Sequence, residues 1–181
     1  MNKHKDNKKG CVYWITGLSG AGKTTIGTLL YNYIYSKKSN VIFLDGDVLR
    51  DVYQSHDYSD EGRRKLAFQN SRLCKMLSDQ GIDVVICLIA MYESCREWNR
   101  NNIERYKEIY LQVPIEKLIE RDQKQLYSKA LRKEVKNVMG IDISYEEPLK
   151  PTLKIDNSGI LSPEEVFKII VNQHDIMEEI Q

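Results

Sequence analysis

Short apolar runs alternate with longer amphipathic stretches along this chain. The runs are rich in β-branched and aromatic residues, which favour strands, and the stretches between them repeat their apolar residues at helical spacing. This alternation predicts an α/β fold, in which helices cover both faces of a mainly parallel sheet. Five strands are expected, near Val12–Thr16, Val41–Leu44, Val84–Ile89, Glu108–Val113 and Leu153–Ile155.

The helices are expected between these strands and after the last one. Their predicted positions are Gly22 to about Tyr35, about Gly62 to Asp79, Glu93–Arg105, Ile115–Arg121 and Pro163 towards Glu179. The last helix has the clearest start, because Ser162 as N-cap and Glu165 three residues later form a capping box around Pro163. A chain of 181 residues, 41% of them hydrophobic, has the size of one compact domain, which we place at residues 11–181.

Composition narrows the partners that need to be considered. The chain has 27 basic and 26 acidic residues, so its net charge gives no reason to expect nucleic acid or a membrane as the partner. Residues 1–10 are polar and basic, and we expect them to form a disordered tail. No apolar stretch follows that is long enough for a signal peptide or a membrane span, so a cytoplasmic protein is expected. The cysteines lack metal-ligand or redox spacing, which predicts reduced, structural thiols.

A phosphate-binding motif follows the first expected strand. The segment Gly17–Thr24 matches G-x-x-x-x-G-K-[ST] and leads directly into a helix, as this motif requires. Its glycines let backbone N–H groups point at phosphate oxygens, and Lys23 can reach the β- and γ-phosphates. The Thr24 hydroxyl is placed to bind Mg²⁺, so we expect ATP to bind as its magnesium complex.

The phosphate loop alone does not separate kinases from GTPases or motor ATPases. Nothing in the chain resembles the Asn-Lys-x-Asp motif with which GTPases read their base, and the chain is short for a motor. A kinase that acts on a small molecule is therefore favoured.

A second polar cluster ends the second expected strand. Asp45 and Asp47 follow its apolar residues, and Arg50 comes next. Carboxyl ends of neighbouring parallel strands converge on one crevice, so these carboxylates should lie near the phosphate loop. There they could deprotonate an attacking hydroxyl or help to hold Mg²⁺, and Arg50 could pair with an anionic substrate group. The alternative is an Asp-Gly-Asp turn beside a surface arginine.

The segment 122–140 is rich in lysine and helix formers. Two interpretations are open: an ordinary solvated helix face, or a mobile lid that closes over the phosphates and excludes water.

Several of these motifs together resemble one known family, the adenylylsulfate kinases, and the resemblance covers nearly the whole chain. These enzymes use MgATP to phosphorylate the ribose 3′-hydroxyl of adenosine 5′-phosphosulfate. The matching segments are Ile15–Thr25, Leu44–Asp47 with Arg50, Tyr58–Ser59 with Arg63, Arg121–Asp122 with Lys124, Leu126–Tyr127 and Lys129–Ala130, then Gly140–Asp142 and Tyr145–Pro148.

The resemblance implies a role for individual residues and a homodimeric assembly. Asp45 would activate the 3′-hydroxyl, with Lys23 and Asp47 as the other catalytic residues and with Thr24 and Asp45 as metal ligands. The ATP side would comprise Gly17, Ser19, Gly20, Ala21, Gly22, Lys23, Thr24, Thr25, Arg121 along the adenine, and Lys124. The acceptor side would comprise Asp47, Arg50, Tyr58, Arg63, Ile89 and Lys129. Tyr58 stands where the family stacks a Phe on the substrate base, and an aromatic face suits that task.

The sequence departs from the family pattern mainly on the acceptor side. Lys65–Gln69 replaces Glu-Asn-Ile-Arg-Arg, and Leu88–Glu93 replaces Phe-Ile-Ser-Pro-Tyr-Arg. Val138 stands where the second aromatic residue of the base sandwich is expected. Loss of polar and stacking contacts changes which base is held.

Three interpretations of these departures remain open. The chain is an adenylylsulfate kinase that has drifted in sequence, or it resembles the related kinases of capsule-sugar pathways that act on cytidine diphosphoramidate. The third is a nucleotide-binding module that has lost catalysis.

Overall fold

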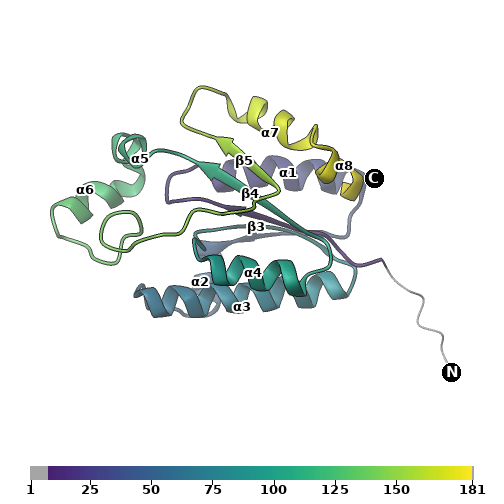
Figure 1. Ribbon diagram of the computed structural model, residues 1–181, viewed down its shortest axis with the longest axis horizontal. Helices are drawn as coiled ribbons and strands as arrows, with labels where there is room; N and C mark the ends of the chain where they lie inside the picture. Colours follow the sequence, from purple (N-terminus) through teal and green to yellow (C-terminus); the bar gives the residue numbers. More distant parts are fainter. Residues whose placement is uncertain (1–7, 181) are drawn as a thin grey trace.

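The computed structural model describes residues 8–180, and all five expected strands are present in it (Figure 1). They form one parallel sheet in the order β2-β3-β1-β4-β5. Their bounds are β1 Val12–Thr16, β2 Val41–Asp45, β3 Asp83–Leu88, β4 Tyr106–Gln112 and β5 Leu153–Asp156. The predicted α/β fold with a parallel five-stranded sheet is confirmed.

The central strand β1 explains why the apolar runs are continuous rather than alternating. Every residue from Val12 to Thr16 is buried, because β1 pairs with β3 on one side and β4 on the other, with helices on both faces. In this register Thr16, the last residue of β1, lies level with Leu88 at the end of β3. The carboxyl ends of these strands therefore meet where the phosphate loop begins.

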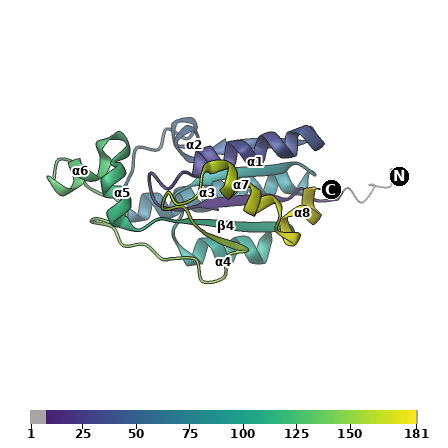
Figure 2. The same ribbon diagram turned by 90° about the horizontal axis from the view of Figure 1, so that it is seen from above.

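Two layers of helices enclose the sheet. Figure 1 shows α1, α7 and α8 over one face and α3 and α4 over the other, while α5 and α6 lie beyond the carboxyl ends of the strands. Figure 2 shows α5 and α6 at the end of the molecule opposite α8. The bounds are α1 Lys23–Lys37, α2 Gly46–Val52, α3 Asp60–Asp79, α4 Glu93–Asn102, α5 Ile115–Arg121, α6 Leu126–Leu131, α7 Pro163–Val171 and α8 His174–Ile180. Among the described residues, no helix has the length and apolar character that a membrane crossing requires.

The expected tail at residues 1–10 falls largely outside the described residues. Its last residue, Gly10, is buried, and its N–H donates to the carbonyl of Ser78 over 2.8 Å. The packed part of the chain therefore includes Gly10.

Two helix predictions need correction. The helix α2 was not predicted; it begins after Asp45, whose side chain caps it by accepting the Asp47 N–H. The final helix does not continue to Glu179. The capping box at Ser162 is present, but α7 ends at Val171 and the chain turns, so that Ile176 and Ile180 of α8 are also buried.

The lysine-rich segment is less helical than its composition suggests. Its one α-helix is α6, followed by a stretch without helix or strand until β5 apart from an isolated bridge at Met139. Lys133 and Asn137 have positive φ angles of 61° and 64°, which an α-helix does not accommodate.

A buried charge cluster fixes α4 against β4 and against the segment after α6. Arg96 is fully buried and pairs with Glu93 (2.8 Å) and with Glu108 (3.4 Å). Arg100 donates to the second oxygen of Glu108 over 2.9 Å. Arg96 also donates to the backbone carbonyl of Glu146 over 2.8 Å. The cluster therefore holds the chain around residue 146 beside the start of α4.

We predict that Glu108 makes stability depend on pH. Burial raises its pKa from an ordinary 4.5 to about 7, against the opposing effect of Arg96 and Arg100. Between these values the folded state keeps a proton that the unfolded state has released, so this stabilising contribution is complete below pH 4.5 and is lost as the pH rises through 7. Relative to Glu108→Gln, the wild-type free energy of unfolding should fall by up to about 3 kcal/mol across that range. Urea unfolding of both proteins at several pH values measures this, and parallel pH profiles would contradict it.

Candidate active site

The phosphate loop between β1 and α1 turns its carbonyl groups away from the cavity beside it. Four successive carbonyls accept side-chain hydrogen bonds: Leu18 from Lys23 Nζ (2.7 Å), Ser19 from Tyr127 Oη (2.9 Å), Gly20 from Arg121 Nη1 (3.3 Å) and Ala21 from Asn157 Nδ2 (2.8 Å). In a trans peptide the following N–H points the opposite way. The N–H groups of Gly20 and Gly22 therefore face away from Tyr127 and Asn157, which do not line the large cavity that the two glycines line.

Two glycines make this loop conformation accessible. Gly20 and Gly22 have φ angles of 77° and 86°, in the region that side-chain-bearing residues rarely adopt. A Cβ at Gly22 would also lie 2.7 Å from Asn157 Nδ2. Gly22 is the N-cap of α1 and no side chain caps that helix, so its first N–H groups remain available to an anion.

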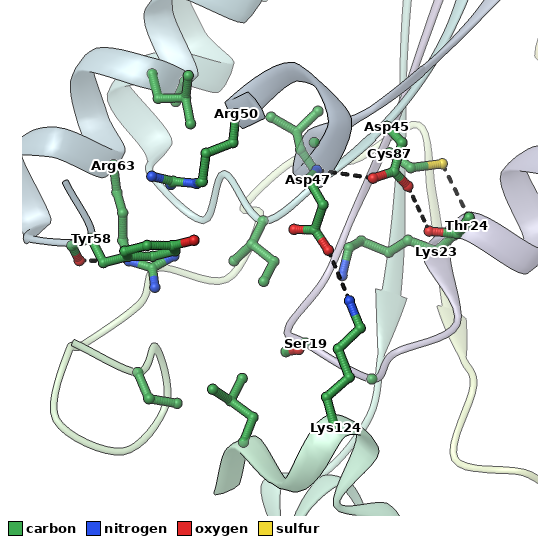
Figure 3. Close-up of a pocket in the computed structure, with 18 of the residues that line it drawn as sticks. Ser19, Lys23, Thr24, Asp45, Asp47, Arg50, Tyr58, Arg63, Cys87 and Lys124 are labelled. Atoms are coloured by element: carbon green, nitrogen blue, oxygen red, sulfur yellow. Dashed lines mark hydrogen bonds and ion pairs between the residues drawn. The ribbon is translucent and has the colours of Figure 1, made fainter. Parts of the chain in front are cut away.

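Lys23 stands at the start of α1, with its ammonium group at the inner side of the loop. Burial lowers its pKa to about 8, against the opposing effect of the neighbouring Cys87, Asp47 and Asp45. The Cys87 thiol donates to the Lys23 carbonyl over 3.2 Å (Figure 3). A bound polyphosphate would raise this pKa, because it places negative charge beside the ammonium group.

Asp45 connects the end of β2 to the phosphate loop. Its Oδ2 accepts a hydrogen bond from Thr24 Oγ1 over 2.8 Å, and its Oδ1 accepts the Asp47 N–H over 2.9 Å (Figure 3). Asp47 points onward to Lys124, whose Nζ lies 3.1 Å from its carboxylate. The two carboxylates thus face different neighbours, the phosphate loop and the segment before α6.

The oxygens of Thr24 and Asp45 fit a magnesium ion. They lie 2.8 Å apart, near the ~3 Å that separates adjacent ligands of an octahedral ion with bonds of about 2.1 Å. Within the described part of the chain, no group of three or more His, Cys, Asp and Glu side chains could hold a metal by itself. An ion here would take its remaining ligands from phosphate and water, as Mg²⁺ commonly does.

Two arginines surround the ring of Tyr58 on the far side of the cavity (Figure 3). The guanidinium carbon of Arg50 lies 4.2 Å from the ring centroid, and that of Arg63 lies 5.5 Å away. Arg50 donates to the carbonyls of Ser55 and Asp57, at 3.1 and 2.9 Å. Neither guanidinium pairs with a carboxylate in the part of the chain that the structure describes, so both charges remain available to an anion.

Arg63 holds a loop as well as contacting the ring. It donates from Nε to the Tyr58 carbonyl (3.0 Å) and from Nη2 to the Asn137 carbonyl (2.7 Å). Asp142 in turn accepts the N–H groups of Asn137 and Val138. The loop around residue 138 is thereby fixed over the cavity, and burial together with nearby Arg50 lowers the pKa of Arg63.

Most of the residues expected from the sequence line one cavity of ≈ 580 Å³. They are Ser19, Gly20, Gly22, Lys23, Thr24, Thr25, Asp45, Asp47, Arg50, Tyr58, Arg63, Ile89 and Lys124. Arg121 instead lines a neighbouring hollow of ≈ 230 Å³, together with Gly22 and Thr25. The lining of these two spaces does not include Gly17, Ala21 or Lys129.

The cavity also has lining residues to which the sequence analysis gave no role. Leu66, Ala67 and Asn70 come from α3, and Leu126, Val135 and Lys136 come from α6 and the loop after it. The three α3 residues follow Arg63 at spacings of three, four and seven, which places all four on one helix face. That spacing was present in the sequence and could have identified Asn70.

Comparison with known proteins identifies kinases of one family as relatives of this chain. The sequence profile of the family described as Adenylylsulphate kinase matches residues 9–156. A cytidine diphosphoramidate kinase of Campylobacter jejuni is 41% identical over 90% of this chain and 95% of its own length. A probable adenylyl-sulfate kinase of Pyrococcus abyssi is 36% identical over 91% of this chain and 95% of its own length.

The fold matches as well. An APS kinase of Mycobacterium tuberculosis, solved in complex with AMPPNP and APS, superimposes with a TM-score of 0.84 at 27% identity, over 94% of this chain and 98% of that one. The cavity, the phosphate loop and these matches agree, and we conclude that the chain belongs to the adenylylsulphate kinase family of phosphotransferases.

Proposed function

We propose that this enzyme transfers the γ-phosphoryl group of ATP to the ribose 3′-hydroxyl of a 5′-substituted nucleotide. The observation that carries the proposal is the 2.8 Å contact between Thr24 and Asp45, which supports a role for the Asp45 carboxylate beside the phosphate loop. The 3′-oxygen attacks the γ-phosphorus, the bond to the β–γ bridging oxygen breaks, and ADP leaves. Asp45 receives the hydroxyl proton.

The loop and Lys23 hold the transferred group. N–H groups of Ser19, Gly20 and Gly22 and the Lys23 ammonium stabilise charge on the phosphates as it shifts towards ADP. Magnesium bound at Thr24 and Asp45 would neutralise part of that charge. Arg121, beside Gly22 and Thr25, is in place to lie along the adenine of ATP.

The acceptor binds on the opposite side of Asp45. Arg50 and Arg63 supply the positive charge for its 5′-phosphate end. Both guanidinium groups contact the ring of Tyr58 in this structure, so stacking of that ring on the acceptor's base requires at least one of them to turn towards the phosphate. Ile89 forms part of the cavity wall.

The segment 122–140 acts as a lid in this proposal. The hydroxyl of Tyr127 donates to the Ser19 carbonyl, and Lys124 pairs with Asp47, so the segment contacts both substrate sides. Closure would bring Lys124 and Lys129 towards the phosphates and exclude water.

Cytidine diphosphoramidate is the second candidate acceptor, beside adenosine 5′-phosphosulfate. Two observations favour it: the 41% identity to a kinase named for that substrate, and Val138 in the cavity wall where a second stacking ring is expected for a purine. Loss of catalysis is the weaker alternative, because Lys23, Thr24 and Asp45 are present and in mutual reach.

Fewer observations bear on the oligomeric state and the cellular location of the protein. A homodimer stays a prediction. A cytoplasmic location is supported by Cys74, Cys87 and Cys95, which are free thiols buried in the core.

We predict that purified enzyme with MgATP releases ADP in the presence of one of the two acceptors and much less without any. Coupled ADP detection gives kcat/KM for each acceptor, and phosphorus NMR of the product locates the new phosphate on the 3′-oxygen. Release of ADP with neither acceptor, or a phosphate at another position, would contradict the proposal.

We predict that Lys23→Ala lowers kcat by about 10²–10³-fold, because it removes the charge that faces the β- and γ-phosphates. The fold should persist, since the Lys23 side chain makes one hydrogen bond among the described residues, to the Leu18 carbonyl. Lys37→Ala is the matched control: it removes an exposed lysine at the other end of α1 and should leave kcat unchanged. Equal turnover of the two variants would refute the role of Lys23.

A further inference from the structure

One face of α3 forms a wall of the large cavity. Arg63, Leu66, Ala67 and Asn70 all line it, at helical spacings that place them in one stripe. Seven residues separate Arg63 from Asn70, which corresponds to about 10 Å along the helix. The stripe is therefore charged at one end, apolar in the middle and ends in a carboxamide.

The carboxamide of Asn70 is buried without a protein partner for its oxygen. The residue is 1% exposed, and its Oδ1 accepts no hydrogen bond from the described residues. Its neighbours on the same face of α3, Leu66 and Ala67, carry no side-chain donor. Buried polar atoms in native proteins are nearly always paired, so this oxygen calls for a donor that enters the cavity.

The cavity around Asn70 suits a nucleobase. The apolar residues that line this cavity, including Ile89 and Val138, can cover the faces of a planar ring, while a polar group meets its edge. A carboxamide carries an acceptor and a donor side by side. Cytosine and adenine each present an exocyclic amino group beside a ring-nitrogen acceptor, which is the complementary pair.

We propose that Asn70 reads the edge of the acceptor's base, with Oδ1 accepting from an exocyclic amino group. The inference rests on the proposed function, because it assumes that the second nucleotide occupies this cavity. It assigns base selection to the residue of α3 that directly follows the substituted segment Lys65–Gln69. Arg50 and Arg63 hold the phosphate end, and Asn70 meets the opposite end of the same ligand.

Asn70→Leu tests the proposal, because leucine keeps the volume and removes both polar atoms. The acceptor KM should rise roughly tenfold, since one hydrogen-bonded pair is lost, while the KM for ATP stays within about twofold. The melting temperature of the ligand-free variant should not fall, because a buried unpaired oxygen has been removed. A purely structural asparagine would give the opposite pattern: an unchanged acceptor KM and a lower melting temperature.

Asn99→Leu is the matched control. Asn99 is also buried, and its Oδ1 likewise has no partner among the described residues, but it lies on α4 and does not line the cavity. Its substitution should leave the acceptor KM unchanged. If Asn70→Leu does not fold, Asn70→Ala provides the same comparison, and an unchanged acceptor KM in either Asn70 variant overturns the inference.

A second readout separates this inference from the proposed function. If the wild-type enzyme phosphorylates neither candidate acceptor, the proposed function fails, and binding of CDP and AMP is then measured by calorimetry on wild type and Asn70→Leu. Weaker binding by the variant still supports base recognition by Asn70. Equal binding, or no binding to either protein, overturns it.

Discussion

The hydrogen bond from Thr24 Oγ1 to Asp45 Oδ2 joins two segments with separate tasks. Thr24 belongs to the first turn of α1, directly after the phosphate loop, and Asp45 ends β2 and caps α2. Each of the two carboxylate oxygens of Asp45 accepts a hydrogen bond, so its orientation is fixed before any ligand binds. Because a phosphoryl-transfer enzyme works mainly through position and charge, this fixed carboxylate is what relates the ATP side to the acceptor side.

Other side chains of the site bind the carbonyl groups of the phosphate loop, which leaves its backbone N–H groups for a phosphate. Four side chains donate hydrogen bonds to the loop carbonyls: Lys23, Arg121, Tyr127 and Asn157. Arg121 and Tyr127 belong to α5 and α6, which lie beyond the carboxyl ends of the strands, and Asn157 belongs to the loop after β5. Distant parts of the fold thus stabilise a local backbone conformation whose N–H groups can meet an anion.

The sequence was informative wherever a local rule applied. Continuous apolar runs located all five strands, and G-x-x-x-x-G-K-T located the phosphate loop. It was less informative where tertiary contacts decide. The helix α2 is only seven residues long, and its signal, a capping aspartate, was also compatible with a turn. The break between α7 and α8 accompanies the burial of Ile176 and Ile180. No local sequence pattern predicts that break.

On the acceptor side, too, sequence motifs identified some residues, while others depend on tertiary contacts. Arg50, Tyr58 and Arg63 were expected there from family motifs, and the structure brings them together around one ring. Their contacts with backbone carbonyls, and the attachment of the 137–142 loop by Arg63, follow from long-range geometry that the sequence does not display. Asn70 was overlooked because no motif contains it, and only the cavity shows that its oxygen is buried and unpaired.

The most direct test of this account is the rate of phosphoryl transfer in Asp45→Asn, measured in a single turnover with enzyme-bound ATP. Asparagine keeps the shape of the side chain but cannot accept the proton or supply the negative charge. We expect ATP affinity to change by only a few fold and the transfer rate to fall by about 10²-fold or more. An unchanged transfer rate would show that Asp45 is only a helix cap, and the proposed chemistry would then be wrong.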